Sequence, residues 1–207
     1  MDLLTKIKKV LAEPSAFFSH LHKEHGVKDA FRYLVVLALF LMLLSFLIAL
    51  VFKPTLPSWW SGILGEQAAQ QLKNTMLEET TPATLFGRAA MGYVGALVGS
   101  FVIAALLHVW ILIFGGKASY AKTYQLAVYA RTPSFVFGWI PYIGGLASIY
   151  SFVLLILGTQ HLYHFSRRRT IVMYLIPAVI FILLAVFLLG FFLTALQADP
   201  GLFAPTP

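Results

Sequence analysis

The chain of 207 residues contains no cysteine, and only 11% of its residues are charged. Disulfides, thiolate metal sites and cysteine nucleophiles are therefore excluded. Acidic residues number eight, and none lies between Leu85 and Ala198. Proton- and sodium-coupled transporters commonly use acids within their spans, so this class is disfavoured. A glycine-rich phosphate loop, an HExxH motif and a nucleophile with a nearby base are also missing. We therefore expect no enzyme, no cofactor and no metal site.

What the chain has in abundance is apolar sequence, because 59% of its residues are hydrophobic. Several runs of about 20 apolar residues are each long enough to cross a hydrocarbon core of ~30 Å. The sequence therefore predicts an all-α polytopic membrane protein with one domain over 29–197. Five transmembrane helices are expected, at about 30–52, 86–114, 120–140, 142–165 and 171–196. Residues 1–28 form a separate cytoplasmic segment, and 198–207 a disordered tail.

The N-terminal segment has the pattern of an amphipathic helix. Apolar residues between Leu3 and Leu11 share one helical face, and three lysines, Lys6, Lys8 and Lys9, lie towards the other. Beside a membrane span, such a helix usually lies in the interface. We expect these lysines, with Arg167, Arg168 and Arg169, to contact an anionic cytoplasmic leaflet. Because the basic residues flank apolar segments, nucleic acid is not an expected partner.

The basic residues also predict the orientation of the chain. With five spans, eleven of the fifteen Lys and Arg residues fall on the side of the N-terminus. The positive-inside rule then places the N-terminus in the cytoplasm and the C-terminus outside. We expect a multi-pass protein of a prokaryotic cell membrane.

Small residues and prolines indicate how the spans pack. Helices in lipid associate through close backbone contact, which small residues permit. The expected packing positions are Gly92, Gly95, Ala96, Gly99, Ser100, Gly144 and Gly145. Their partner is either another span or a second copy of the chain. Kinks are expected at Pro133, Pro141 and Pro177, and Pro177 frees the carbonyl of Met173 from its helical hydrogen bond.

Arg131 is the most unusual residue of the predicted spans. It lies ~16 Å along the third span, where a charge costs at least ~2.5 kcal/mol unless it is partnered or hydrated. Pro133 supplies a local acceptor, the freed carbonyl of Tyr129. Two interpretations follow, a kink-capping arginine that hydrates a crevice, or a ligand site.

Histidines complete the set of polar candidates. His108 is expected to be a hydrogen-bonded structural residue, with a functional role as the alternative. His161 and His164 could form a cluster with it, but metal binding is disfavoured because no carboxylate completes the ligand set. The candidate intramembrane polar site is therefore Arg131, His108, His161 and Tyr129.

A pattern of aromatic residues, prolines and glycines runs through most of the chain and consists of Pro14, Phe17, Phe18, Tyr124, Tyr129, Pro133, Pro141, Gly144, Gly145, Tyr150, Gly158 and His161. In this pattern the sequence resembles the Yip family of Ypt/Rab-interacting membrane proteins. The resemblance implies a non-enzymatic multi-pass protein, and its eukaryotic members act in membrane traffic and contact Rab-type GTPases. This chain lacks a long polar N-terminal region and looks like the short prokaryotic form.

Two hypotheses of function follow. The first is a non-enzymatic membrane-organising, scaffolding or trafficking-type protein, with a membrane-protein partner or a second copy of itself as possible partners. The second is a small transporter or channel with a polar crevice around Arg131 and His108.

Overall fold

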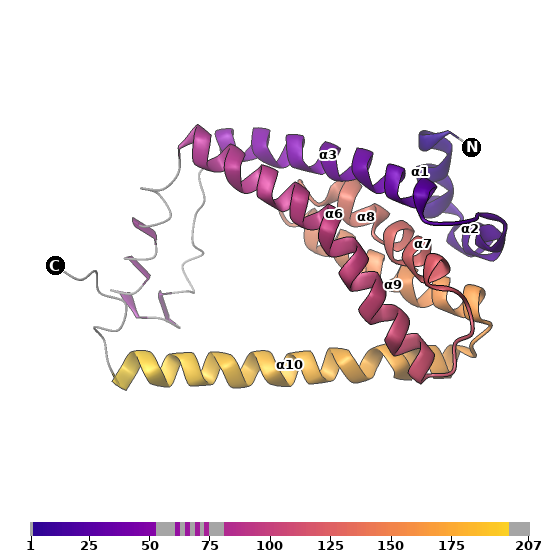
Figure 1. Ribbon diagram of the computed structural model, residues 1–207. Coiled ribbons are helices and arrows are strands. Elements are labelled where there is room, and N and C mark those ends of the chain that lie inside the picture. Colours follow the sequence, from indigo (N-terminus) through magenta and orange to yellow (C-terminus); the bar gives the residue numbers. More distant parts are fainter. Residues whose placement is uncertain are drawn as a thin grey trace.

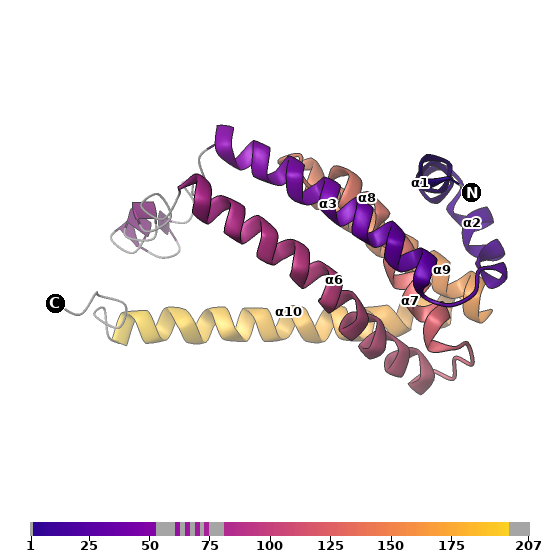
Figure 2. The same ribbon diagram turned by 45° about the horizontal axis from the view of Figure 1, so that its top comes forward.

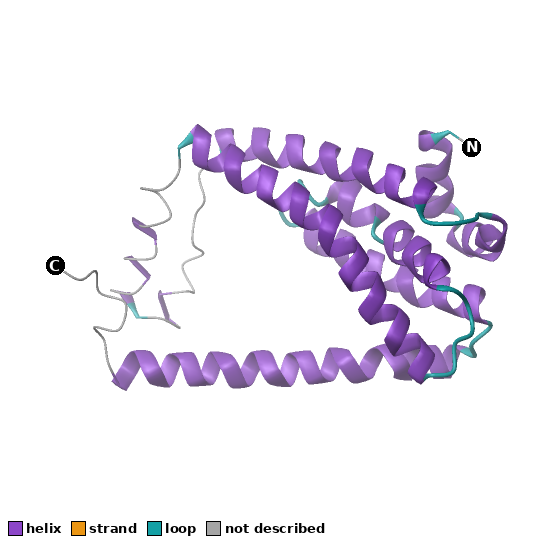
Figure 3. Cartoon of the chain, in the orientation of Figure 1, coloured by secondary structure: helices purple, strands orange, loops and turns teal. Residues whose placement is uncertain are grey.

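The computed structural model describes residues 2–52, 61–62, 65–66, 69–70, 73–74 and 81–198. Within these ranges every regular element is a helix (Figure 3). The N-terminal segment forms α1 (Leu3–Ala12), α2 (Pro14–His20) and the 3-10 helix η1 (Leu21–Lys23). Pro14 occupies the first turn of α2, a position where its missing N–H costs nothing. The predicted tail beyond Ala198 and most of the 53–80 connection lie outside the described residues.

Four helices of the described part are long and apolar enough to cross a membrane. They are α3 (Lys28–Val51), α6 (Pro82–Ile113), α9 (Ile143–Tyr163) and α10 (Arg167–Ala198). The start of α6 is fixed by a capping box between Thr81 and Thr84, with Pro82 following the cap. The prediction of an all-α polytopic membrane protein is confirmed.

The predicted count of five continuous spans needs correction at residues 120–140. This stretch forms two short helices, α7 (Tyr120–Ala130) and α8 (Thr132–Phe137), and neither is long enough to cross a bilayer. The break follows from Pro133, which has no N–H to donate to the carbonyl of Tyr129. The hydroxyl of Thr132 donates to that carbonyl instead, at 2.7 Å.

The helices form an open bundle rather than a closed one (Figures 1 and 2). α3 and α6 lie side by side, and α8 and α9 form an antiparallel hairpin whose corner is Pro141 and Tyr142. α10 diverges from α6 in both views. Up to residue 192, its buried residues are Thr170, Met173 and Tyr174, all near its start, and every residue at 179–192 is exposed. Most of α10 is therefore free to contact lipid or another protein.

The buried core lies towards one end of the bundle, where the N-terminal helices sit. Every residue of α7 from Thr123 to Ala130 is buried. Around α7 lie α1, α2, η1, the start of α3, the end of α9 and the start of α10, together with the 114–119 and 164–166 connections (Figure 1). We call this the basic end, because it holds eleven Lys and Arg residues: Lys6, Lys8, Lys9, Lys23, Lys28, Arg32, Lys117, Lys122, Arg167, Arg168 and Arg169.

Candidate functional site

An ion pair between two parts of the N-terminal segment meets α7 at the basic end. Nζ of Lys6 lies 2.9 Å from Oε1 of Glu24, and the two side chains are only 14% and 18% exposed. The hydroxyl of Tyr129 donates to the same Glu24 oxygen at 2.7 Å and accepts from Lys6 at 3.0 Å. A carboxylate that accepts from two donors is well satisfied at this burial. Tyr129 thus joins α1 to the residue that follows η1.

The aromatic ring of Tyr129 packs against two other aromatic rings. It is fully buried, with the rings of Phe17 and Tyr33 edge-on at 5.2 and 5.1 Å between centroids. Edge-to-face pairs of this kind add attraction beyond the area that they bury. The hydroxyl of Tyr33 also lies 2.9 Å from Oγ1 of Thr132. The break between α7 and α8 is therefore tied to α3.

Two further side chains of α7 bind the backbone that leads into α3. Nζ of Lys122 donates to the carbonyls of Leu21, His22 and Glu24. The amide of Gln125 donates to the carbonyl of Gly26 at 2.6 Å. Gly26 has φ of 70°, a conformation that glycine adopts without strain. These bonds fix the connection between η1 and α3.

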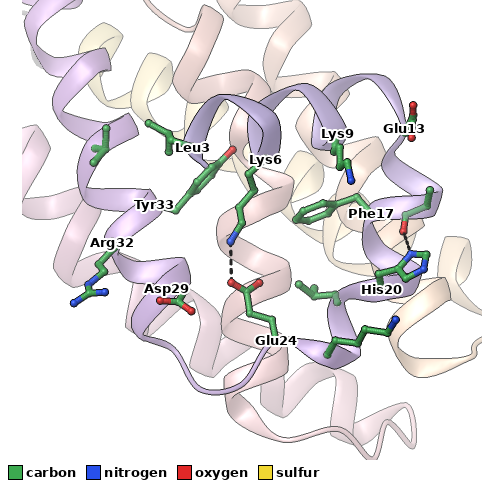
Figure 4. Close-up of a pocket in the computed structure, with 14 residues that line it drawn as sticks. Leu3, Lys6, Lys9, Glu13, Phe17, His20, Glu24, Asp29, Arg32 and Tyr33 are labelled. Atoms are coloured by element: carbon green, nitrogen blue, oxygen red, sulfur yellow. Dashed lines mark hydrogen bonds and ion pairs between the residues drawn. The ribbon is translucent and has the colours of Figure 1, made fainter. Parts of the chain in front are cut away.

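A cleft of about 940 Å³ opens between the N-terminal helices and the start of α3 (Figure 4). The pair of Lys6 and Glu24 lies at its centre, and Arg32 and Lys9 lie at its margins. Its other charged lining residues are Glu13, Lys23 and Asp29. The cleft therefore mixes both signs of charge around one partly buried ion pair.

The residues predicted to contact anionic lipid differ in their surroundings. Lys8 and Lys9 are exposed, whereas Lys6 is part of the ion pair. Arg167 and Arg168 are exposed at the start of α10. Arg169, also exposed, donates to the carbonyl of Phe114 and lies over the ring of Phe165 at 4.3 Å. Through these two contacts, Arg169 connects the end of α6 to the turn that precedes α10.

His108 belongs to a second hydrogen-bonded group, between α6, α7 and α9. Its Nδ1 lies 2.7 Å from Oγ1 of Thr123, which lies 2.5 Å from the hydroxyl of Tyr163. The ring of Tyr120 is edge-on to the imidazole at 5.8 Å. An imidazole that is hydrogen-bonded to a buried hydroxyl has a partner for that ring nitrogen, which suits a structural role. The hydrogen bond of the His108 Nδ1 therefore goes to Thr123 of α7 and not to Arg131.

The structure separates the other candidate polar residues. His161 is half-buried near the end of α9. Among the described residues, no three His, Asp or Glu side chains lie where they could hold a metal ion, so His108, His161 and His164 form no metal-binding cluster. Arg131 lies at the break between α7 and α8, exposed and lining a crevice against α6.

The small residues of α6 divide into two faces. Ser100 is buried, and its hydroxyl lies 3.0 Å from that of Tyr124. Ala96 packs partly against the core and also lines the Arg131 crevice. Gly92, Gly95 and Gly99 line the Arg131 crevice, and a Cβ added at any of them would meet nothing within 4 Å.

The hairpin glycines also differ. A Cβ at Gly144 would meet the carbonyl oxygen of Gly138 at 2.8 Å, whereas one at Gly145 would meet open space. Beyond the hairpin, the indole of Trp110 donates at 3.1 Å to the carbonyl of Met173, the group that Pro177 leaves without its helical donor.

Several residues of this site were not singled out from the sequence. Glu24 is the partner of both Lys6 and Tyr129, and Thr123 joins His108 to Tyr163. A usable signal was present: Lys122, Thr123 and Gln125 are polar residues close together in an otherwise apolar stretch. Polar residues within a span usually face protein rather than lipid.

These observations define a multi-pass α-helical membrane protein whose N-terminal helices are locked into its helix bundle. The family model described as the Yip1 domain matches residues 8–189. The chain belongs to the Yip1 domain family, as the resemblance predicted. No curated protein and no solved structure matches the chain.

Proposed function

We propose that this is a non-enzymatic membrane-organising protein whose basic end binds an anionic cytoplasmic leaflet. The observation that carries the proposal is that five separate segments with exposed cations meet at one end of the bundle, as their ribbons show in Figure 1. These segments are α1, η1, the start of α3, the 114–119 connection and the start of α10. The basic end contains eleven Lys and Arg residues but only four Asp and Glu residues, which are Asp2, Glu13, Glu24 and Asp29.

The locked N-terminal segment supports this role. Each Lys or Arg near an anionic surface contributes about 1 kcal/mol of attraction. A free peptide would lose conformational entropy when it bound, whereas Lys8 and Lys9 lie on a helix already held by the Lys6–Glu24–Tyr129 contacts. The basic end therefore binds the leaflet as a rigid surface.

The organising role is supported by what the rest of the molecule offers. Yip proteins are not known as enzymes. Long apolar faces of α6 and α10 are exposed at residues such as Met91, Val98, Leu106 and Phe187. Apolar surface of this extent lies against lipid or against another membrane protein. A protein that binds a leaflet at one end and offers such faces within the bilayer can gather lipids and partners around itself.

The proposal predicts that charge removal at the basic end reduces enrichment of anionic lipid. We expect the combined substitution Lys8→Gln, Lys9→Gln, Arg167→Gln and Arg168→Gln to lose most of the enrichment, since each charge contributes about 1 kcal/mol. The measurement is the ratio of phosphatidylglycerol to phosphatidylcholine retained by protein purified from vesicles of mixed composition. The enrichment should also fall as salt rises.

Two single substitutions, Lys8→Gln and its control Lys73→Gln, each remove one exposed lysine. Lys73 is exposed and lies in the connection between α3 and α6, at the other end of the predicted spans. Lys8→Gln should lower the enrichment and Lys73→Gln should leave it unchanged. Equal enrichment in the wild-type protein and the fourfold variant would refute binding by the basic end.

A further inference from the structure

Arg131 faces a crevice that none of the contacts described above explains. The crevice has a volume of about 410 Å³. Gly92, Gly95 and Gly99 of α6 line it, together with Ser134 of α8 and Ser148 of α9. The hydroxyls of these two serines bond Ser151 and the carbonyl of Gly144, respectively. The wall on α6 is open because its glycines leave space that a side chain would fill.

The crevice continues into an apolar cavity between α3 and α6. This second cavity has a volume of about 230 Å³. The two share four lining residues: Leu41, Gly92, Ala96 and Phe135. Together they extend along α6 from Ile103 to Ala89, which is ~21 Å at 1.5 Å per residue. We call this combined space the α6 groove; it is polar and cationic at one part and apolar over the remainder.

Among the residues that the structure describes, the Arg131 guanidinium has no counter-charge. Within the described residues, no hydrogen bond or ion pair involves the Arg131 guanidinium, and residues 82–198 contain no Asp or Glu. The local acceptor expected from the sequence, the carbonyl of Tyr129, receives the hydroxyl of Thr132. A guanidinium within a bilayer costs free energy unless an anion or water approaches it. An oxyanion suits it, because the guanidinium can donate two parallel hydrogen bonds.

We propose that the α6 groove binds an acidic lipid. The phosphate or carboxylate of the lipid pairs with Arg131, and an acyl chain lies along the glycine face of α6 towards Met42 of α3. The charge at one part of the groove matches the anionic head, and the apolar lining of the remainder matches the chain. Because His108 bonds Thr123 and does not line the groove, the site works without it.

Native mass spectrometry of purified protein tests this proposal. Delipidated protein is titrated with phosphatidylglycerol and, in parallel, with inorganic phosphate. We expect tight binding of one phosphatidylglycerol and no competition by phosphate at comparable concentrations. Arg131→Gln should weaken lipid binding about tenfold or more, because the variant loses a charge-assisted interaction. Lipid binding unchanged in Arg131→Gln would overturn the proposal.

A second variant separates the acyl chain from the head group. Gly95→Leu keeps Arg131 but fills the groove, and it should also weaken lipid binding. Gly145→Leu is its control, since Gly145 also has open space around its Cβ but does not line the groove. If Gly95→Leu binds lipid as the wild type does, or if inorganic phosphate displaces the lipid, the site is a simple anion site and the proposal fails.

The inference stands apart from lipid binding at the basic end. The fourfold variant there keeps Arg131 and the groove, so it should still bind the single tight phosphatidylglycerol. Loss of that lipid in the fourfold variant, with Arg131→Gln unaffected, would move the tight site to the basic end.

Discussion

Tyr129→Ala is expected to lower the free energy of unfolding by about 3–5 kcal/mol, as is typical of a buried aromatic side chain cut to alanine. Tyr129 is fully buried between the rings of Phe17 and Tyr33, so the substitution leaves a cavity where α2, α3 and α7 meet. It also removes the hydroxyl that bonds both Lys6 and Glu24. We expect the N-terminal helices to detach before the rest of the bundle unfolds.

Tyr129→Phe separates the hydroxyl from the ring. The ring contacts persist, and the loss is a hydrogen bond to a charged group, about 1.5–3 kcal/mol. Thermal unfolding in detergent measures both variants, and hydrogen exchange over residues 3–23 reports detachment of the N-terminal helices. Tyr142→Ala is the control, because Tyr142 is 97% exposed at the hairpin corner. Equal effects of Tyr129→Ala and Tyr142→Ala would contradict the proposed role of Tyr129.

Gly158→Ala is expected to destabilise the protein, although alanine is the better helix former. A Cβ at Gly158 would lie 2.4 Å from Cδ1 of Leu126 and 2.9 Å from the ring of Phe18. Both neighbours are buried, at 0% and 1% exposure, and so have little room to move. Overpacking of a filled core costs about 1–3 kcal/mol. The expected result is a lower melting temperature and faster hydrogen exchange in α2, which packs on α9 at this glycine.

Gly145→Ala, in the same helix, is expected to have the opposite effect on stability. Its Cβ would meet nothing within 4 Å, so the gain in helix propensity, up to about 1 kcal/mol, should appear as added stability. The two variants differ only in the space around the new methyl group. If Gly158→Ala were as stable as Gly145→Ala, the close contact of α2 with α9 would be refuted.

The residues of the basic end show how far sequence reasoning reaches. Lys6 and Tyr129 were each singled out, Lys6 for lipid contact and Tyr129 for a polar site within a span. They are 123 positions apart, and their hydrogen bond depends on how α1 folds against α7. Amphipathic periodicity shows which face of α1 is charged but not which partner that face meets. The role of Glu24 was missed for the same reason, because a single acid in a polar segment carries no pattern.

Arg131 shows a similar limit. Its position within a predicted span and the acid-free sequence around it were evident, and they raised the question of its partner. Two answers were left open, a kink cap and a ligand site. In the structure, the hydroxyl of Thr132 donates to the carbonyl of Tyr129. Arg131 lines the same crevice as three glycines of α6. Neither fact follows from spacing, because each depends on the relative rotation of α6, α7 and α8.

The sequence by itself determined the helical class, the membrane setting and the positions of the long helices. These depend on the length and polarity of contiguous segments, because a backbone in lipid must satisfy its hydrogen bonds within each helix. The tertiary structure decided that the N-terminal segment is locked to α7 and α9 and that α10 diverges from α6. Those outcomes depend on side chains far apart in the chain, such as Lys6 with Tyr129 and Phe18 with Gly158, which no local pattern brings together.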